Sequence, residues 1–350
     1  MSGFREFTVP YARSGARELR LFVTAPERGD PPYPTLLDFH GGAWTHFEPR
    51  VDLAWCRELA RAGVLCVSAE FRLAPEHPWP AFLADARAAL RWLTAHGDTL
   101  GGDVSRLATI GGSTGGFLSI LLALCPRSED EEPTSAIDTP DTLAPALPRA
   151  AIGFYPIVDV VGRHRMVRAT RFGALARLLR AGLGPPRRRG QHLPSPAPRL
   201  DQLHTLKSRH PLLGGFAGGL VNRASAAASR LGFVKLAVFE ELAADHEGAF
   251  ASERAMHDAS PLERVRERRI QERPPLLVIQ GRADINVTAA MTESFAAAYR
   301  SAGGEIEVRF EDGFPHAFAS VPSPQSDAAI RATLAFLTRQ RLLAPHRRNP

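Results

Sequence analysis

The chain has 350 residues, of which 44% are hydrophobic and 23% are charged, a composition typical of an ordinary globular protein. Its net charge is +6, and no apolar run reaches the roughly 20 residues that a membrane-spanning helix needs. The N-terminal sequence lacks the apolar segment of a secretory signal peptide, so we expect a cytoplasmic protein.

Seven apolar runs along the chain predict β-strands. They are Glu18–Val23, Thr35–Phe39, Val64–Ala69, Arg106–Gly111, Ala150–Tyr155, Pro275–Gln280 and Glu305–Phe310. Helix-like stretches lie between most of these runs or follow them, at Ala81–Gly97, Gly116–Leu124, Thr288–Ser301 and Asp327–Arg341. Strands that alternate with helices pair in parallel and carry helices on both faces, which predicts one α/β domain over residues 1–350.

Two segments interrupt this alternation. Residues 127–148 are acidic and rich in proline, which predicts a mobile surface loop. Residues 160–258 contain helix-like pieces around an irregular stretch, which predicts a cap or lid inserted into the domain. Residues 160–200 of this insertion include ten arginines and no aspartate or glutamate. We interpret them as a solvated cap surface; the alternative is a patch that contacts a membrane or another anionic partner.

The three cysteines, Cys56, Cys66 and Cys125, lie in apolar surroundings, and we expect them to be buried free thiols. No cysteines or histidines have the spacing of a metal site, so we expect no metal ion. We also expect no nucleic-acid partner, and the sequence is compatible with a homodimer.

The stretch "LATIGGSTGGFL" places Ser113 between Gly111 and Gly115, in the pattern G-x-S-x-G. A predicted strand precedes the pattern and a predicted helix follows it, which is the context of a nucleophile elbow. Glycine neighbours allow the chain to pass close to a serine that is held in an unfavourable backbone conformation. We therefore predict that Ser113 is a nucleophile; the alternative is a structural turn that contains a hydroxyl group.

A serine nucleophile needs a base, and the base needs a group that orients it. In folds with this elbow the acid and then the histidine follow the serine in the chain. Asp284 follows the strand in "PPLLVIQGRADINV", and His316 lies in a glycine–proline loop after "EIEVRF". We predict that His316 is the base and Asp284 the orienting acid. Asp245 and Asp258, in or beside the insertion, are the weaker candidates for the acid.

Acyl transfer also needs N–H donors for the negative charge that develops on the carbonyl oxygen. Thr114, the residue after the serine, is expected to supply one of them. The others are expected from "HGGAW", residues 40–44, which follows the strand that ends at Phe39. We interpret His40 as a residue that shapes this loop; the alternative is that it acts as a base.

The motifs "HGGAW", "FRLAPEHPWPA" and "GGSTGG", with the placement of Asp284 and His316, resemble those of the hormone-sensitive-lipase-like esterases. The resemblance covers about residues 36–318, apart from the insertion. It implies the α/β-hydrolase fold, with an eight-stranded, mostly parallel sheet flanked by helices and a helical cap. It also implies hydrolysis of carboxylic esters without a cofactor.

The resemblance further implies that Gly42, Ala43 and Thr114 supply the oxyanion N–H groups. The remaining residues of the two glycine motifs are then scaffold: His40, Gly41, Gly111 and Gly115. The segment "FRLAPEHPWPA" is expected to brace the loops below the site.

The sequence departs from the usual family motifs beside the nucleophile. Ala43 replaces a glycine of the first motif, Gly112 replaces an acidic residue, and Thr114 replaces an alanine. The larger side chain of Thr114 is expected to narrow the acyl side of the site and to favour short acyl groups. Candidates for the apolar lining of the substrate pocket, which are equally well explained as core residues, are Trp44, Phe47 and Trp79.

The sequence thus predicts a serine esterase that cleaves small-molecule carboxylic esters through an acyl-enzyme intermediate. One alternative keeps the same residues but cleaves an amide, a lactone, a thioester or an acylated secondary metabolite. Another is a non-catalytic binding protein, because relatives of this fold serve as small-molecule receptors in plants after loss of the histidine. The presence of Ser113, Asp284 and His316 favours the enzyme.

Overall fold

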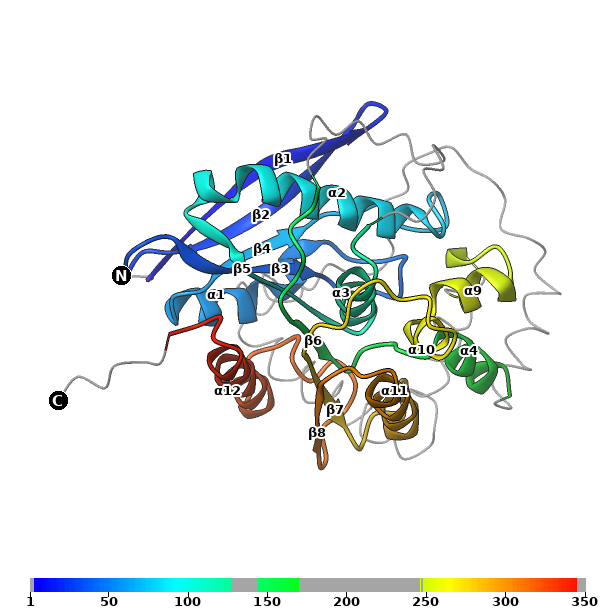
Figure 1. Ribbon diagram of the computed structural model, residues 1–350. Helices are drawn as coiled ribbons and strands as arrows, with labels where there is room; N and C mark the ends of the chain where they lie inside the picture. Colours follow the sequence, from blue (N-terminus) through cyan, green and yellow to red (C-terminus); the bar gives the residue numbers. More distant parts are fainter. Residues whose placement is uncertain (1–2, 128–143, 170–245, 247, 345–350) are drawn as a thin grey trace, which may run out of the picture. The chain divides into compact units, whose positions relative to one another are not determined.

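The computed structural model describes residues 3–127, 144–169, 246 and 248–344, and it contains an eight-stranded sheet (Figure 1). The strands occur in the order β1-β2-β4-β3-β5-β6-β7-β8. Their bounds are β1 Phe4–Ser14, β2 Arg17–Pro26, β3 Tyr33–Phe39, β4 Leu65–Ala69, β5 Gly102–Gly112, β6 Ala151–Phe154, β7 Leu276–Gly281 and β8 Ile306–Glu311. The pairs β1–β2 and β2–β4 are antiparallel, and all later neighbours are parallel. This confirms the predicted α/β fold with a mostly parallel sheet.

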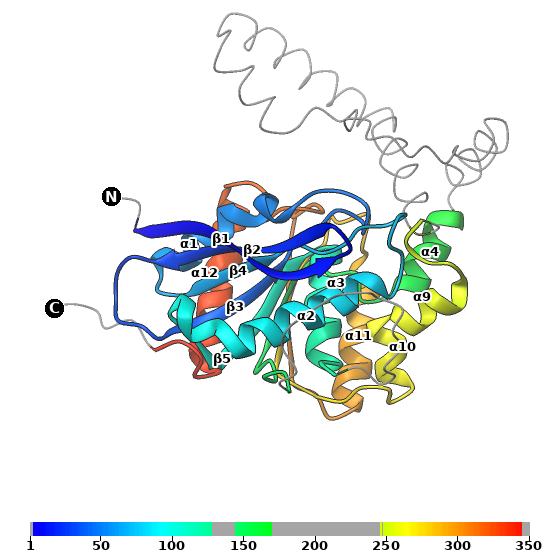
Figure 2. The same ribbon diagram turned by 90° about the horizontal axis from the view of Figure 1, so that it is seen from above.

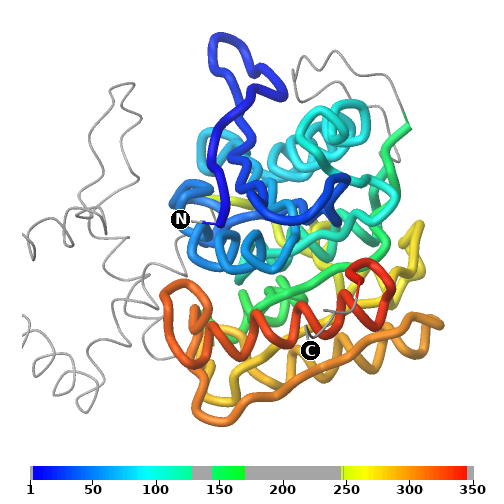
Figure 3. Tube along the Cα trace, turned by 90° about the vertical axis from the view of Figure 1, so that its left-hand side faces the viewer, coloured from blue at the N-terminus to red at the C-terminus, as the bar shows by residue number. Residues whose placement is uncertain are grey.

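The sequence did not predict β1, whose edge position explains why its pattern is weak. Pro10 interrupts the strand, and the pairing with β2 shifts register between Pro10 and Ala12. A proline cannot donate to a neighbouring strand, so within sheets it is confined to edges and bulges. In Figure 3 the blue β1–β2 hairpin and the orange β8 region lie at opposite sides of the fold, in agreement with the strand order.

Helices cover both faces of the sheet (Figures 1 and 2). On one face, α1 and α12 pack their apolar residues into one buried cluster with the sheet. On the other, a second cluster joins the sheet to α2, α3, α10 and α11. The bounds of these helices are α1 Leu53–Arg61, α2 Ala81–His96, α3 Thr114–Leu124, α10 Pro261–Arg266, α11 Ala289–Ser301 and α12 Pro324–Arg339. Every residue of α3 is buried, as its uniformly apolar sequence predicts for a helix enclosed by the core.

The chain divides into two compact units, residues 1–164 with 245–350, and residues 165–244. The second unit lies inside the predicted insertion, 160–258, but most of it falls outside the described residues, and so does most of the predicted acidic loop. The end of the predicted insertion belongs to the first unit, because Phe250 and Met256 are buried in its core. No helix in the described part of the chain is long and apolar enough to span a membrane.

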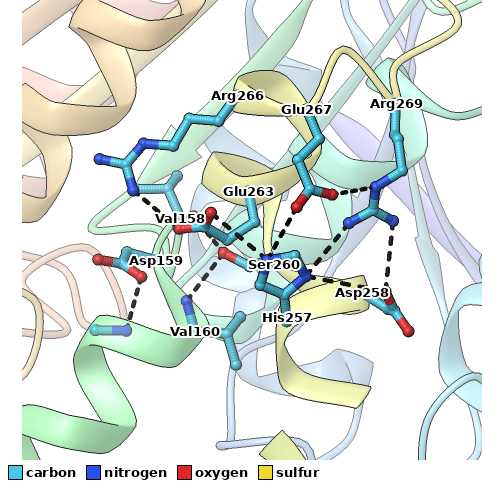
Figure 4. Close-up of polar contacts among 11 residues, drawn as sticks. Val158, Asp159, Val160, His257, Asp258, Ser260, Glu263, Arg266, Glu267 and Arg269 are labelled. Carbon is cyan, nitrogen blue, oxygen red and sulfur yellow. Dashed lines mark hydrogen bonds and ion pairs between the residues drawn. The ribbon is translucent and has the colours of Figure 1, made fainter. Parts of the chain in front are cut away.

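The chain leaves the sheet after β6 and returns towards β7 at one hydrogen-bonded junction (Figure 4). Here α4, Val160–Ala169, begins, and α9, Glu253–Ala259, ends. Ser260 Oγ donates to the Val158 carbonyl and accepts from the Val160 N–H, at 3.4 Å in each case. The Leu262 N–H also donates to the Val158 carbonyl, at 2.9 Å. These bonds join the two ends of the interrupting segment.

A cluster of charged side chains lies beside this junction (Figure 4). His257 Nε2 is 3.2 Å from the Glu267 carboxylate, which accepts from Arg269 at 2.6 Å. Asp258, one of the weaker acid candidates, also faces Arg269, at 3.5 Å. These groups are partly exposed, so we interpret them as a surface network that supports the corner between α9 and α10.

Candidate active site

Ser113 occupies the sharp turn between β5 and α3. Its backbone has φ 55° and ψ −117°, a conformation that costs energy for a residue with a side chain. The turn is held from both sides, because the Ser113 N–H donates to the Phe154 carbonyl and the Ser113 carbonyl accepts from the Phe117 N–H, both at 2.9 Å. The structure therefore places the serine where the sequence predicted it, in a strained and well-anchored elbow.

The elbow packs so closely on β3 that its glycines cannot carry side chains. A Cβ atom on Gly115 would lie 1.8 Å from the Phe39 carbonyl oxygen, and one on Gly111 would lie 2.4 Å from the Gly115 backbone. A Cβ on Gly41 would lie 3.5 Å from the Cβ of Ser113. The "HGGAW" loop and the elbow are thus in direct contact.

Ser113, His316 and Asp284 form one hydrogen-bonded chain across three loops. Ser113 Oγ is 3.0 Å from His316 Nε2, and His316 Nδ1 is 2.8 Å from Asp284 Oδ2. Because a carboxylate only accepts, Nδ1 carries the proton and Nε2 is left free to accept the serine proton. The Asp284 side chain is fully buried, whereas 17% of the His316 side chain is exposed. Residues far apart in the sequence are brought together by the carboxyl ends of β5, β7 and β8.

Other donors fix the Asp284 carboxylate. Its Oδ1 accepts from the N–H groups of Asn286 and Val287, at 2.8 and 2.9 Å. Its Oδ2 accepts from Gln280 Nε2 at 3.1 Å, besides the contact with His316. The sequence analysis missed Gln280, although a polar residue at the end of the apolar strand "LLVIQ" was a usable signal.

Of the other two acid candidates, the structure describes only Asp258, which does not contact the histidine. Asp258 lies in the surface network beside the α9–α10 corner. Asp245 falls outside the described residues.

The "HGGAW" loop has an unusual backbone, with positive φ at Gly42, Ala43 and Trp44. The Gly42 carbonyl accepts from the N–H groups of Thr45 and His46, at 3.1 and 2.9 Å. Since N–H and C=O point in opposite directions across a trans peptide bond, the Ala43 N–H points away from this turn. Within the described residues, neither Gly42 nor Ala43 donates its N–H to another backbone group.

Thr114, the third predicted donor, begins α3. The first N–H groups of a helix have no acceptor within the helix, so the Thr114 N–H is available beside Ser113. Its side chain is buried, with 2% exposed, and Oγ1 has no hydrogen-bond partner among the described residues. Thr114 thus places a backbone N–H beside the serine, and its side chain occupies space next to the serine.

His40 is buried below the loop and stacks on Phe71, with ring centroids 4.4 Å apart. Its Nδ1–H donates to the Gly41 carbonyl at 2.6 Å. Burial lowers the pKa of His40 to about 4, although the bond to Gly41 acts in the opposite direction. His40 is therefore neutral at pH 7 and contacts the loop, as expected for a residue that shapes it.

The neutral state of His40 predicts a pH dependence of stability. Between about pH 6.5 and pH 4 the unfolded chain binds a proton at this residue and the folded chain does not, so the free energy of unfolding falls as the pH falls. The loss attributable to His40 is up to roughly 3 kcal/mol. Urea unfolding at several pH values should show a smaller loss for His40→Gln than for the wild type.

The comparison with the variant separates the effect of His40 from that of a nearby group whose contribution to stability changes with pH in the opposite direction. Burial raises the pKa of Asp38 to about 7, so this carboxyl group reduces stability as the pH rises. Asp38 is present in both proteins and cancels in their difference. Equal pH dependences for the wild type and His40→Gln would contradict the prediction.

The candidate lining residues lie in different environments. Trp44 is 2% exposed and packs in edge contact with Phe117 and Phe250. Trp79 is partly buried and also lies near Phe250, whereas Phe47 is 57% exposed. Trp44 and Trp79 thus have the contacts of core residues, and Phe47 is the candidate that remains open to a ligand.

A buried ion pair supports the segment "FRLAPEHPWPA". Asp85 on α2 accepts from the Arg72 guanidinium at 2.6 Å and from the Arg72 N–H at 2.7 Å. Both side chains are almost completely buried. The next residues return to the "HGGAW" loop, since the Ala74 N–H donates to the Trp44 carbonyl at 2.9 Å. The ion pair thus anchors the start of a segment that contacts this loop two residues later, whereas Glu76 is exposed.

Comparison with known proteins finds similarity in two parts of the chain. The family model described as alpha/beta hydrolase fold matches residues 36–206, and that of the prolyl oligopeptidase family matches residues 216–341. Esterase LipI of Mycobacterium tuberculosis is 40% identical over 29% of this chain and 31% of its own length. The probable carboxylic ester hydrolase LipM of the same organism is 36% identical over 36% of this chain and 28% of its own. The chain matches less than a third of the length of either relative.

Solved structures extend the similarity over the whole fold. A thermophilic esterase from Thermogutta terrifontis, solved with propionate bound, has a TM-score of 0.63 and 20% identity, and the match covers 99% of this chain and 97% of that one. The carboxylesterase EstE1, cloned from a metagenomic library, has a TM-score of 0.61 and 20% identity, with 98% and 90% covered. The chain thus has the α/β-hydrolase fold, and its motifs and its curated relatives are similar to those of the hormone-sensitive-lipase-like esterases.

Proposed function

We propose that the protein is a serine esterase that hydrolyses small-molecule carboxylic esters, with Ser113, His316 and Asp284 as its catalytic residues. The observation that carries the proposal is the continuous hydrogen-bond chain from Ser113 Oγ through His316 to Asp284, at 3.0 and 2.8 Å. The strained backbone of Ser113 and the esterase relatives support it.

The geometry accounts for each step of the reaction. Ser113 Oγ attacks the ester carbonyl carbon while His316 Nε2 takes the hydroxyl proton. The tetrahedral intermediate then collapses: the C–O bond to the alcohol breaks, and His316 gives its proton to the leaving oxygen. Water, deprotonated by His316, attacks the acyl-enzyme, and the carboxylic acid leaves as Ser113 regains its proton. Asp284 holds the Nδ1–H and stabilises the imidazolium in both half-reactions.

The N–H groups of Gly42, Ala43 and Thr114 are proposed as the oxyanion hole. Within the described residues, none of these three N–H groups donates to a backbone carbonyl, so each is available to a substrate oxygen. The replacement of glycine by Ala43 keeps the backbone donor, and this residue already adopts positive φ. Donors fixed in advance by the backbone stabilise the developing charge without reorganisation.

A fluorophosphonate probe tests the proposal directly, because it phosphonylates only an activated serine. We expect rapid labelling of the wild type, none of Ser113→Ala, and loss of p-nitrophenyl acetate hydrolysis in the same variant. Ser119→Ala is the matched control. This serine also lies on α3, but its hydroxyl donates to the Ile152 carbonyl, at 3.3 Å, and not to the histidine. A wild-type protein that is not labelled would exclude a serine hydrolase.

We further propose a preference for short acyl groups, because the volume of Thr114 lies next to the nucleophile. With p-nitrophenyl esters of increasing acyl length, kcat/KM should be highest for acetate to butyrate and should fall for longer chains. Thr114→Ala should shift the optimum to longer chains. Faster turnover of long-chain esters by the wild type would refute this preference and leave the reaction class intact.

The location in the cytoplasm is also a proposal. It is supported by the three cysteines, all of which are buried and none of which forms a disulfide.

A further inference from the structure

Tyr155 is a buried aromatic residue at the end of β6 that has no part in the reaction described above. Its side chain is 1% exposed, and its backbone has φ 42°, which is uncommon for a residue with a side chain. The residue before it, Phe154, accepts from the Ser113 N–H. Tyr155 therefore leaves the sheet directly beside the nucleophile, in a conformation that the surrounding structure must hold in place.

The Tyr155 side chain contacts the loop that carries His316. Its ring packs edge-on against the His316 imidazole and against Phe318, with centroids 4.9 Å apart in each pair. Its hydroxyl is hydrogen-bonded to Ser320 Oγ at 3.2 Å. Burial raises the pKa of Tyr155 above its ordinary value, so the hydroxyl stays protonated throughout the pH range in which an esterase is assayed.

The same hydroxyl lies against the elbow on its other side. A Cβ atom on Gly112 would lie 2.8 Å from the Tyr155 hydroxyl and 3.1 Å from two ring carbons. Residue 112 adopts an ordinary strand conformation, so backbone freedom does not explain the glycine there. The space that a side chain at 112 would occupy is taken by Tyr155.

We propose that Tyr155 is a positioning residue, which fits between Gly112 and the 316–320 loop and thereby sets the distance from His316 Nε2 to Ser113 Oγ. The proposal rests on the catalytic roles proposed above. Displacements of about 1 Å at reacting atoms can lower turnover by roughly 10²-fold. The Tyr155 ring and hydroxyl therefore act on kcat through His316, without contact with the substrate.

Two variants perturb this contact from opposite sides. Tyr155→Phe removes the bond to Ser320 and should lower kcat by roughly 3- to 10-fold, because the ring still supports His316. Gly112→Ala pushes the ring towards the histidine loop and should lower kcat by roughly 10- to 100-fold. In both, KM for a p-nitrophenyl ester should stay within about twofold, and the rate of fluorophosphonate labelling should fall with kcat.

The double variant Gly112→Ala/Tyr155→Phe distinguishes positioning from general damage. Without the hydroxyl, the closest contact to the new methyl group disappears, so kcat should recover above that of Gly112→Ala alone. The matched control is Tyr299→Phe, which also removes a buried tyrosine hydroxyl. This hydroxyl donates to the Pro274 carbonyl, at 2.7 Å, and not to the loop that carries His316. The control variant should lose stability in urea unfolding with an unchanged kcat.

Failure of this inference is separable from failure of the proposed function. If the wild type is labelled at Ser113 but Tyr155→Phe and Tyr299→Phe both keep the wild-type kcat, Tyr155 has no positioning role and the esterase remains. Additive losses in the double variant would overturn it as well. Should Gly112→Ala not fold, the comparison of the two tyrosine variants still decides.

Discussion

Replacing His316 with alanine should lower kcat for an ester by roughly 10⁵- to 10⁶-fold, the range expected when a base that acts as a unit with its nucleophile is removed. His316 Nε2 is the nitrogen within hydrogen-bond distance of Ser113 Oγ, and Nδ1 is held by Asp284. Asp284→Asn should cost less, roughly 10⁴-fold, because an amide can still contact the ring but can favour the wrong tautomer. Steady-state kinetics with p-nitrophenyl acetate measures both.

The two variants should also differ in stability. Asp284 accepts four hydrogen bonds, and an asparagine at this position cannot accept all of them. Part of its effect will therefore be structural, and urea unfolding should show a lower stability for Asp284→Asn than for His316→Ala. A His316→Ala variant that keeps more than a tenth of the wild-type kcat would contradict the assignment of the base.

Replacing Arg72 with methionine should lower the free energy of unfolding by roughly 3–5 kcal/mol, because it leaves the buried Asp85 carboxylate without its partner. Burial already raises the pKa of Asp85, and Arg72 opposes that shift. Without the arginine the folded-state pKa rises further above its unfolded value. The loss should therefore be largest at neutral pH and smaller below about pH 3, where the carboxyl group is protonated in both the folded and the unfolded state.

Two controls separate the buried pair from a surface effect. Arg72→Met/Asp85→Leu removes both charges and should recover much of the stability lost in the single variant. Arg57→Met breaks the partly exposed pair with Glu6, at 2.8 Å, and should cost less than about 1 kcal/mol. A loss below 1 kcal/mol for Arg72→Met at pH 7 would show that the pair does not brace the fold.

Much of the fold could be predicted from apolar periodicity, because the central strands are buried on both faces. Each of the seven predicted strands overlaps an observed one, and β7 and β8 are each shifted by a single residue. The edge strand β1 was not predicted, because many of its residues are exposed to solvent and Pro10 interrupts its alternation of apolar and polar residues. Helix α1 was also missed, because its nine residues are too few to show a clear helical period.

The site was predictable where chemistry requires a particular residue at a particular place. The serine pattern, its strand-to-helix context and the order of acid and histidine predict Ser113, Asp284 and His316, which the structure brings within hydrogen-bond distance of one another. Gln280 and Tyr155 were not predicted. Gln280 contacts Asp284 and Tyr155 contacts His316, and these contacts arise only when the chain folds. Nothing in the local sequence of Gly112 shows that a tyrosine 43 positions later will occupy the space beside it.

The hydrogen bonds of Ser260 to Val158 and Val160 have a consequence for how the protein can diverge. They fix both ends of the intervening segment within the unit that carries Ser113, Asp284 and His316. A change in the length or sequence of residues 165–244 therefore need not alter the spacing of the reacting groups on the sheet.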